Sequence, residues 1–284
     1  MTDLPSLAVT GSTGGVGGLV ARQLAEAGVA QRLLVRNAGK APVIEQAVVL
    51  ACSYADRAAS ERALEGVDTL LMVSGSEAVD RLDQHRAFID AAKACGVKHI
   101  VYTSFTAAAP NATFTLARDH YFTEEYVKAA GIAHTFLRDN LYLDFMSALV
   151  GDDGVIRGPA GDGRFAAVTR ADVARTACVV LQDPTAHRNQ TYDLTGPEAL
   201  TMSDAARTLS EARGTPVTFH DESIPEAYES RKRWAAPSWQ VDAWVSTYLA
   251  IAAHELAVVS PDVERLTGQR PLTLTEFLRT NAAK

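Results

Sequence analysis

The sequence predicts an α/β fold, a doubly wound parallel sheet with a smaller C-terminal α+β lobe. As far as residue 138, short β-branched runs alternate with longer amphipathic stretches, which is typical of repeated βαβ units. Each short run is apolar almost throughout, as expected of strands that helices cover on both faces. Gly28, Gly96 and Gly131 stand where helices would end and where a left-handed conformation is often needed.

Six strands are expected in this first part of the chain, and amphipathic helices such as Val16–Ala27 and Asp80–Ala94 connect them. Six parallel strands with crossover helices make a Rossmann fold. The expected strands cover Leu7–Thr10, Arg32–Val35, Ala47–Ala51, Thr69–Val73, His99–Thr103 and His134–Leu137.

After Asn140 the alternation loosens into a glycine-rich segment, GDDGVIRGPAGDGRF. Further strand-like pieces follow around Tyr192 and Val217, and the tail is largely helical. We assign these pieces and the tail to the smaller lobe. We therefore expect two domains, residues 1–140 with the sheet and residues 141–284 as a smaller, mostly helical substrate lobe.

Charge and composition exclude several classes of function. The net charge of -7, without any basic run, argues against a nucleic-acid partner, because phosphate binding needs a surplus of Lys and Arg. No stretch has the apolar length of a signal peptide or a membrane span, so we expect a cytoplasmic protein without a membrane partner. Cys52, Cys95 and Cys178 lack paired spacing, which predicts neither disulfides nor a zinc site.

Apolar residues recur at helical spacing from Trp239 to Ile251 in the tail. Such a stripe predicts either core packing or the face of a homodimer.

The motif GSTGGVG comes directly after the first expected strand and directly before an apolar helix. Gly11, Gly14 and Gly17 let the backbone turn tightly and approach a pyrophosphate without a Cβ in the way. The N–H groups from Thr13 to Val16 would then face two phosphates, with the positive end of the helix dipole behind them. This position in the fold predicts a dinucleotide site.

The end of the second expected strand predicts which dinucleotide is bound. An NAD site usually has an acidic residue there, but this chain has LLVRNAGK, with Arg36 and Lys40. A guanidinium can bind a 2′-phosphate in bidentate fashion and the lysine adds charge. NADP(H) is therefore the expected cofactor, while a solvated strand-end arginine is the alternative reading.

Over nearly the whole chain, these motifs resemble the NmrA-like atypical short-chain dehydrogenases/reductases, close to the NAD(P)H:quinone oxidoreductase type 2 and triphenylmethane reductase group. The resemblance also rests on QHRAFIDAAKACGVKHIVYTS, DHYFTE, TFLRDNLYLDF and AGDGRFAAVTRADVA. It implies that the dinucleotide contacts the glycine turn, the strand-end arginine, the ends of the fourth and fifth strands and one histidine. In this chain those residues are Gly11, Thr13, Gly14, Gly15, Val16, Gly17, Arg36, Ser74, Thr103, Ser104 and His120.

Two positions depart from the pattern of the group. Ser53 replaces an aspartate that usually lies near the adenine, although Tyr54 beside it is retained as an expected cofactor contact. Asp139 stands where the group usually has Asn, and Asn140 follows it. We expect Asn140, Tyr142 and Phe145 to bind substrate, and core packing is the alternative for Tyr142 and Phe145.

Most short-chain dehydrogenases protonate their product with the Tyr of a Tyr-x-x-x-Lys pair, and here those two places fall on Leu116 and His120. Losing a placed general acid costs on the order of a hundred- to ten-thousand-fold in rate for a simple carbonyl. A quinone differs, because its reduction leaves a delocalised phenolate, and a cationic dye needs no proton. The missing tyrosine thus favours a conjugated acceptor.

His120 is the candidate catalytic residue, by positioning the cofactor or by donating a proton. A structural pair with Glu124 is the alternative, and no third ligand accompanies these two residues to suggest a metal. The leading hypothesis is an NADPH-dependent reductase that passes a hydride directly to a quinone or similar acceptor. The alternatives are a non-catalytic NADP-binding redox sensor of the NmrA type and a nucleotide-sugar epimerase or dehydratase.

Overall fold

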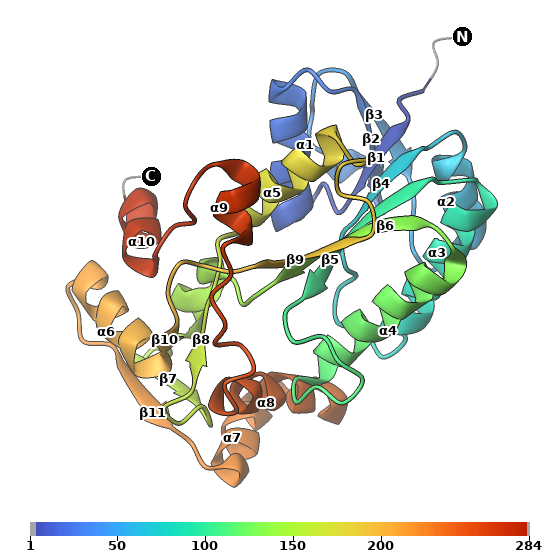
Figure 1. The fold of residues 1–284 in the computed structure, drawn as a ribbon. Coiled ribbons are helices and arrows are strands. Elements are labelled where there is room, and N and C mark those ends of the chain that lie inside the picture. Colours follow the sequence, from blue (N-terminus) through green and yellow to red (C-terminus); the bar gives the residue numbers. More distant parts are fainter. Residues whose placement is uncertain (1–3, 283–284) are drawn as a thin grey trace. The chain divides into compact units, whose positions relative to one another are not determined.

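The structure, a computed structural model, describes residues 4–282 (Figure 1). Contacts between residues divide the chain into two units, each made of several segments. The first unit comprises residues up to 105, 119–138 and 170–192, and the second comprises residues 106–118, 139–169 and those from 193 onward. Residues 1–3 and 283–284, the ends of the two predicted domains, lie outside the described residues. The predicted division at residue 140 stays a prediction.

The central sheet has seven strands in the order β3-β2-β1-β4-β5-β6-β9. The pairs β1–β2, β1–β4, β2–β3 and β4–β5 are parallel, and this order matches the doubly wound fold. The fold class predicted from the sequence is therefore confirmed. The strands are β1 (Leu7–Thr10), β2 (Gln31–Val35), β3 (Ala47–Ala51), β4 (Thr69–Met72), β5 (His99–Phe105), β6 (Ala133–Asp139) and β9 (Gln190–Leu194).

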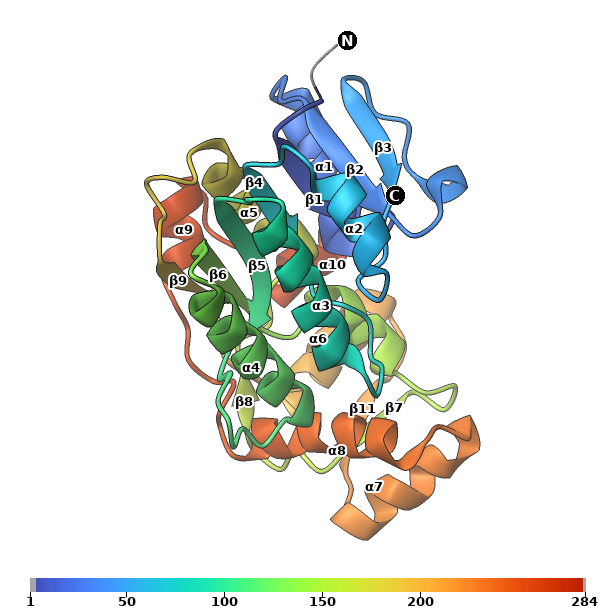
Figure 2. The same cartoon turned by 90° about the vertical axis from the view of Figure 1, so that its right-hand side faces the viewer.

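Helices lie on both faces of this sheet, α1 and α5 on one face and α2, α3 and α4 on the other (Figures 1 and 2). A cluster of buried residues that includes Leu64, Leu70, Phe88 and Ile89 fills the space beneath α2 and α3. The sheet is thus covered as its apolar strands require. The helices are α1 (Gly15–Glu26), α2 (Arg57–Leu64), α3 (Arg81–Ala94), α4 (Thr115–Ala130) and α5 (Arg170–Gln182), with a 3-10 turn η1 (Ala38–Lys40).

All six expected strands are present, and β1 and β3 have the expected bounds. Gly28, Gly96 and Gly131 adopt positive φ angles of 72°, 74° and 75° after their helices, as expected of glycines that end helices.

The strand around Tyr192 is placed differently from the expectation. It was assigned to the C-terminal lobe, but β9 joins the main sheet beside β6, so that assignment is wrong. The local sequence of an edge strand does not indicate which sheet the strand joins, because its position depends on pairing with a strand that is distant in the sequence.

The second unit contains two short ladders and most of the remaining helices. β7 pairs with β11 in parallel, which confirms the strand expected near Val217, and β8 pairs with β10 in antiparallel fashion. Capping boxes begin α6 and α7. The elements are η2 (Leu143–Leu149), β7 (Val155–Gly158), β8 (Arg164–Phe165), β10 (Leu200–Thr201), α6 (Met202–Arg213), β11 (Thr218–Asp221), α7 (Ile224–Arg231), η3 (Lys232–Trp234), α8 (Ser238–Ala252), α9 (Asp262–Thr267) and α10 (Leu274–Ala282).

Candidate functional site

The glycine motif forms a tight turn between β1 and α1. Gly11 has a φ of 65°, and the N–H of Gly14 donates to the carbonyl oxygen of Gly11 at 2.8 Å. A Cβ on Gly17 would lie 2.5 Å from the carbonyl oxygens of both Thr10 and Gly11. Only glycine at position 17 therefore lets α1 pack this closely against the end of β1.

The first turn of α1 presents backbone N–H groups without partners in the helix, as every helix start does. Gly14 is the N-cap and offers no side-chain hydrogen bond to them, and the first turn carries no acidic residue. Thr13, Gly14 and Gly15 are exposed. This end of α1 can therefore bind an anion through its backbone and through the helix dipole.

A cavity of about 240 Å³ opens beside this turn, and we call it the glycine-turn pocket. Its walls come from the turn and from the carboxyl ends of the four strands β1, β2, β3 and β4, as the doubly wound topology predicts. The lining residues are Thr10, Gly11, Thr13, Gly14, Gly15, Val16, Gly17, Leu34, Val35, Arg36, Cys52, Ser53, Tyr54, Val73, Ser74, Gly75, Ser76 and Gln84.

Arg36 directly follows β2 and is exposed at the rim of this pocket. The Asn37 side chain accepts a hydrogen bond from the N–H of Gly39 at 3.0 Å and so caps the short turn η1. Lys40 is the last residue of η1 and is also exposed. The pocket lining contains no acidic residue within the part of the chain that the structure describes.

Tyr54 forms a partly buried wall of the glycine-turn pocket. Its hydroxyl donates to the carbonyl oxygen of Val73 at 2.6 Å and lies 2.7 Å from the Thr10 hydroxyl, while its ring stacks on Phe88. Burial raises the pKa of this phenol well above its ordinary value. Tyr54 therefore offers a neutral ring face to the pocket rather than an acid.

The side chains of Thr103 and Ser104, in β5, form hydrogen bonds with other residues of the first unit. The hydroxyl of Thr103 accepts from the N–H of Ser74 at 2.8 Å. The hydroxyl of Ser104 donates to Glu124 at 2.6 Å, and Glu124 forms a bidentate ion pair with Arg138. Thr103 thus holds the segment that follows β4, and Ser104 joins β5 to α4.

His120 is buried and both of its ring nitrogens have protein partners. Arg81 donates to Nε2 at 3.0 Å, so Nδ1 carries the proton and donates to the Tyr102 hydroxyl, also at 3.0 Å. Burial, followed by the charge of Arg81, holds the pKa of His120 well below its ordinary value. Since Glu124 bonds with Ser104 and Arg138, the structure does not support a His120–Glu124 pair.

The three expected substrate residues lie in the second unit. The Asn140 side chain donates to the carbonyl oxygen of Leu256 at 3.0 Å and accepts from the N–H of Leu141 at 2.8 Å, so its amide is used within the protein. The Tyr142 hydroxyl donates to Asp139 in a short hydrogen bond. Phe145 is 48% exposed, and its ring centroid lies 6.1 Å from that of Tyr142.

Most of the predicted cofactor residues meet in the glycine-turn pocket. Within residues 4–282, four of them lie outside its lining, namely Lys40, Thr103, Ser104 and His120. Sequence reasoning missed most of the strand-end residues of the lining, such as Val35, Val73 and Gly75. The rule that parallel strand ends share one edge could have found them.

Arg170 is a further residue that the sequence analysis did not select. It begins α5, and its Cδ and Nε would lie 2.7 and 2.9 Å from a Cβ placed on Gly15. This arginine therefore covers the exposed backbone at the start of α1. Only the packing of α5 against α1 reveals it, since the two positions are far apart in the sequence.

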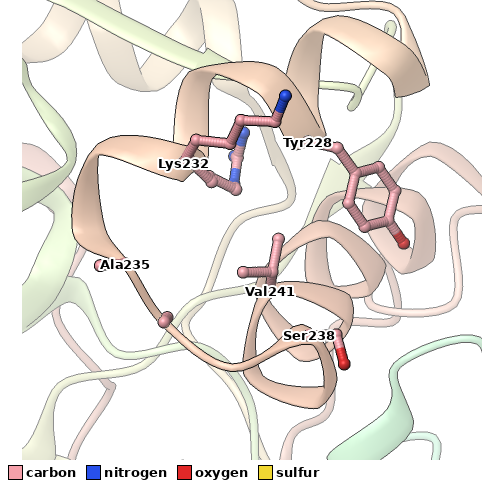
Figure 3. Close-up of a pocket in the computed structure, with 7 residues that line it drawn as sticks. Tyr228, Lys232, Ala235, Ser238 and Val241 are labelled. Carbon is pink, nitrogen blue, oxygen red and sulfur yellow. The ribbon is translucent and has the colours of Figure 1, made fainter.

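A second hollow, of about 400 Å³, lies in the second unit and is called here the α7–α8 hollow (Figure 3). The Arg231 guanidinium in its wall donates to Glu222 at 2.8 Å, and Lys232 pairs with Glu229 at 2.6 Å. Its charged groups are thus paired within the protein. The lining residues are Tyr228, Arg231, Lys232, Ala235, Ala236, Ser238 and Val241.

Neither a membrane-spanning helix nor a cluster of metal ligands is present in the described residues. No helix in residues 4–282 combines the length and apolar character that crossing a membrane requires. No group of three or more His, Cys, Asp or Glu side chains in the same part of the chain is placed to hold a metal ion.

Comparison with known proteins identifies the family. The model of the NmrA-like family matches residues 5–233. The chain belongs to this family. Two curated relatives of this NmrA-like protein cover nearly its whole length: quinone oxidoreductase 2 of Escherichia coli (strain K12) is 34% identical, over 95% of this chain and 96% of its own, and an NAD(P)H azoreductase of Xenophilus azovorans is 30% identical, over 97% of each.

A solved structure agrees with these relatives. The NmrA-like chain superposes with a TM-score of 0.89 on a crystal structure of an NADPH-dependent quinone oxidoreductase from Escherichia coli, complexed with NADPH. The two chains are 33% identical, and the similarity covers 97% of this chain and 99% of the other. The family resemblance and the fold expected from the sequence are therefore confirmed.

Proposed function

We propose that this protein is an NADPH-dependent oxidoreductase that passes a hydride directly to a quinone or a similar conjugated acceptor. The observation that carries the proposal is the glycine-turn pocket. The start of α1 presents backbone N–H groups to this cavity, and Arg36 places a cation at its rim. Relatives named quinone oxidoreductase and azoreductase, and a similar structure complexed with NADPH, support it.

The residues of the pocket fit a dinucleotide phosphate. We propose that the N–H groups of residues 13–17 bind the pyrophosphate, that Arg170 adds charge beside them, and that Arg36 and Lys40 bind the 2′-phosphate. We propose that Gly11, Tyr54 and Ser74 complete the walls, with Thr103 and Ser104 supporting them. When bound, NADPH supplies the hydride, and these residues hold it in place.

The class of acceptor follows from the absence of a tyrosine acid at the start of α4. Leu116, in its first turn, occupies the place of the usual tyrosine acid. His120, the other expected donor, has both ring nitrogens engaged by Arg81 and Tyr102, which favours a positioning role over proton donation. A quinone or a conjugated dye suits such a site, because its reduction leaves little charge localised on one atom. Orientation of the acceptor is then the main catalytic contribution of the protein.

Substrate contacts, assembly and location are further parts of this proposal. We propose that Tyr142 and Phe145 contact the flat acceptor and that Asn140 shapes the backbone beside them. We also propose a cytoplasmic location without a nucleic-acid partner, in line with the net charge of -7. A homodimer that uses α8 is proposed from its half-buried Trp239 and Trp244, and light scattering of the purified protein tests it.

Turnover and cofactor choice are tested together. We expect NADPH oxidation with benzoquinones, naphthoquinones or cationic dyes. Arg36→Glu should raise the Kd for NADPH about 100-fold and leave that for NADH nearly unchanged, because the charge reversal repels only the 2′-phosphate. Arg62→Glu, an exposed charge reversal outside the pocket lining, is the matched control. An absence of turnover on every acceptor, with NADPH bound in calorimetry, would remove the proposal.

A further inference from the structure

The loop after β4 forms one wall of the glycine-turn pocket through Ser74, Gly75 and Ser76. Both backbone groups of Gly75 are held by side chains of α3. The N–H of Gly75 donates to His85 Nε2 at 2.9 Å, and the Gly75 carbonyl oxygen accepts from Arg81 Nε at 2.9 Å. We propose that Arg81 and His85, together called the Gly75 clamp, are positioning residues that fix this wall for dinucleotide binding; this rests on the proposed function.

The clamp depends on one helix face. Arg81 and His85 are four residues apart, so α3 presents both side chains on the same side. Gln84 of the same helix lines the pocket directly. Any shift of α3 along its axis would therefore displace the Gly75 peptide and a lining side chain together.

The protonation state of His85 is set by its partners. Nε2 accepts from Gly75 and therefore carries no proton, so Nδ1–H donates to the Thr123 hydroxyl at 2.9 Å. That hydroxyl in turn donates to the Asp119 carbonyl oxygen at 2.7 Å. His85 is fully buried, and burial together with Arg81 lowers its pKa to about 3, so it remains a neutral acceptor near neutral pH.

The guanidinium of Arg81 also has several partners within the protein. Besides Gly75, its guanidinium bonds with His120 Nε2 at 3.0 Å and lies 3.3 Å from a carboxylate oxygen of Asp119. The side chain is only 5% exposed. His120 therefore acts on the pocket through Arg81, which gives this histidine a positioning role one step behind the clamp.

Two further contacts connect His85 with residues that line the pocket. A Cβ on Gly75 would lie 3.1 Å from His85 Nε2, so the close approach of the imidazole favours glycine at this place in the wall. The His85 ring also makes an edge contact with Tyr54, with ring centroids 5.9 Å apart. His85 thus supports two lining residues, Gly75 and Tyr54, at once.

A wall that is held before binding lowers the entropic cost of ordering it when the dinucleotide arrives. A buried donor or acceptor that loses its partner also carries a desolvation cost, and this cost destabilises the bound conformation of the wall. Removing the His85 acceptor should therefore weaken NADPH binding, although no contact between His85 and the dinucleotide is required.

The test compares two substitutions of His85 in the full-length protein. His85→Gln can still accept from Gly75 through its amide oxygen and donate to Thr123 through its amide nitrogen, whereas His85→Leu can do neither. His99→Leu is the matched control, because His99 is another buried histidine bonded to a threonine, at 2.8 Å, but it begins β5 and lies outside the pocket lining.

We expect His85→Leu to raise the Kd and the KM for NADPH about 10-fold while kcat changes less than about 3-fold. His85→Gln should stay within about 3-fold of the wild type, and His99→Leu should lower the Tm without changing the Kd. An unchanged Kd in folded His85→Leu, or an equal loss in His85→Gln and His99→Leu, would overturn the clamp.

Amide hydrogen exchange in the ligand-free protein gives a readout that does not depend on turnover. Protection at Gly75 should fall in His85→Leu and be retained in His85→Gln and in His99→Leu. If the wild type binds NADPH but reduces no acceptor, the proposed function fails while the clamp is still judged by Kd and exchange. If the wild type binds no NADPH, both proposals are overturned.

Discussion

The glycine-turn pocket and the α7–α8 hollow are both concave and both contain cations, but they differ in what their polar groups do. In the pocket, the backbone at the start of α1 faces the cavity, and the buried groups that hold the wall behind it are the neutral His85, hydroxyl groups and the Arg81 guanidinium. In the hollow, Arg231 and Lys232 are paired with carboxylates of the same unit. Concavity alone therefore does not make a binding site; polar groups that remain available for a ligand do.

The largest expected effect breaks the ion pair of the hollow. Arg231→Met leaves Glu222 buried without its partner and should destabilise the protein by about 3 to 5 kcal/mol in urea unfolding. The Kd for NADPH should not change, because Arg231 lines the hollow and is not part of the glycine-turn pocket. Adding Glu222→Gln should restore part of the loss, since it removes the uncompensated charge. A changed Kd in folded Arg231→Met would show that the hollow takes part in NADPH binding.

The next effect falls on the pocket. Gly17→Ala places a Cβ 2.5 Å from two carbonyl oxygens, so α1 must move away from the turn. We expect a rise of about 100-fold in the Kd for NADPH, measured by calorimetry on protein whose fold is checked by circular dichroism. Gly96→Ala is the control, because a Cβ there meets nothing within 4 Å and only the positive φ is strained. Equal affinities in the two variants would contradict this role of the turn.

A smaller effect concerns pH and the neutral groups behind the pocket. Burial lowers the pKa of His85 to about 3, below the ordinary value of 6.5 that applies in the unfolded chain. The unfolded state therefore binds a proton that the folded state does not, so this stability is complete above pH 6.5 and is lost as the pH falls toward 3. His85→Gln should reduce the slope of unfolding free energy between pH 6 and 4 by about 1.4 kcal/mol per pH unit. An unchanged slope in urea titrations would show that His85 is protonated in the fold.

The smallest expected effect concerns the exposed cation of the hollow. Lys232 and its partner Glu229 are about 70% exposed, so solvent screens the pair. Lys232→Ala should change the free energy of unfolding by less than about 0.5 kcal/mol and leave the Kd for NADPH unchanged. A clear loss of NADPH affinity would instead connect the hollow with the cofactor.

Much of the fold could be predicted because its signals are local. The apolar runs and the helix-ending glycines depend on near neighbours, and the strands that they predict are present. The edge strand β9 was misplaced, since its position depends on pairing with β6, which is distant in the sequence. For the candidate site, the glycine turn and Arg36 were visible as a motif, whereas Gly75 and Arg170 were not.

The sequence by itself determined the succession of strands and helices as far as residue 138, the glycine turn and the cationic end of β2, because steric and periodic constraints act over a few residues. Only the tertiary structure decided which nitrogen of His85 and of His120 carries the proton and that both imidazoles hold protein partners. These assignments depend on side chains that α3, α4 and the strand ends bring together. A hydrogen bond depends on distance in space, which the order of residues along the chain does not specify.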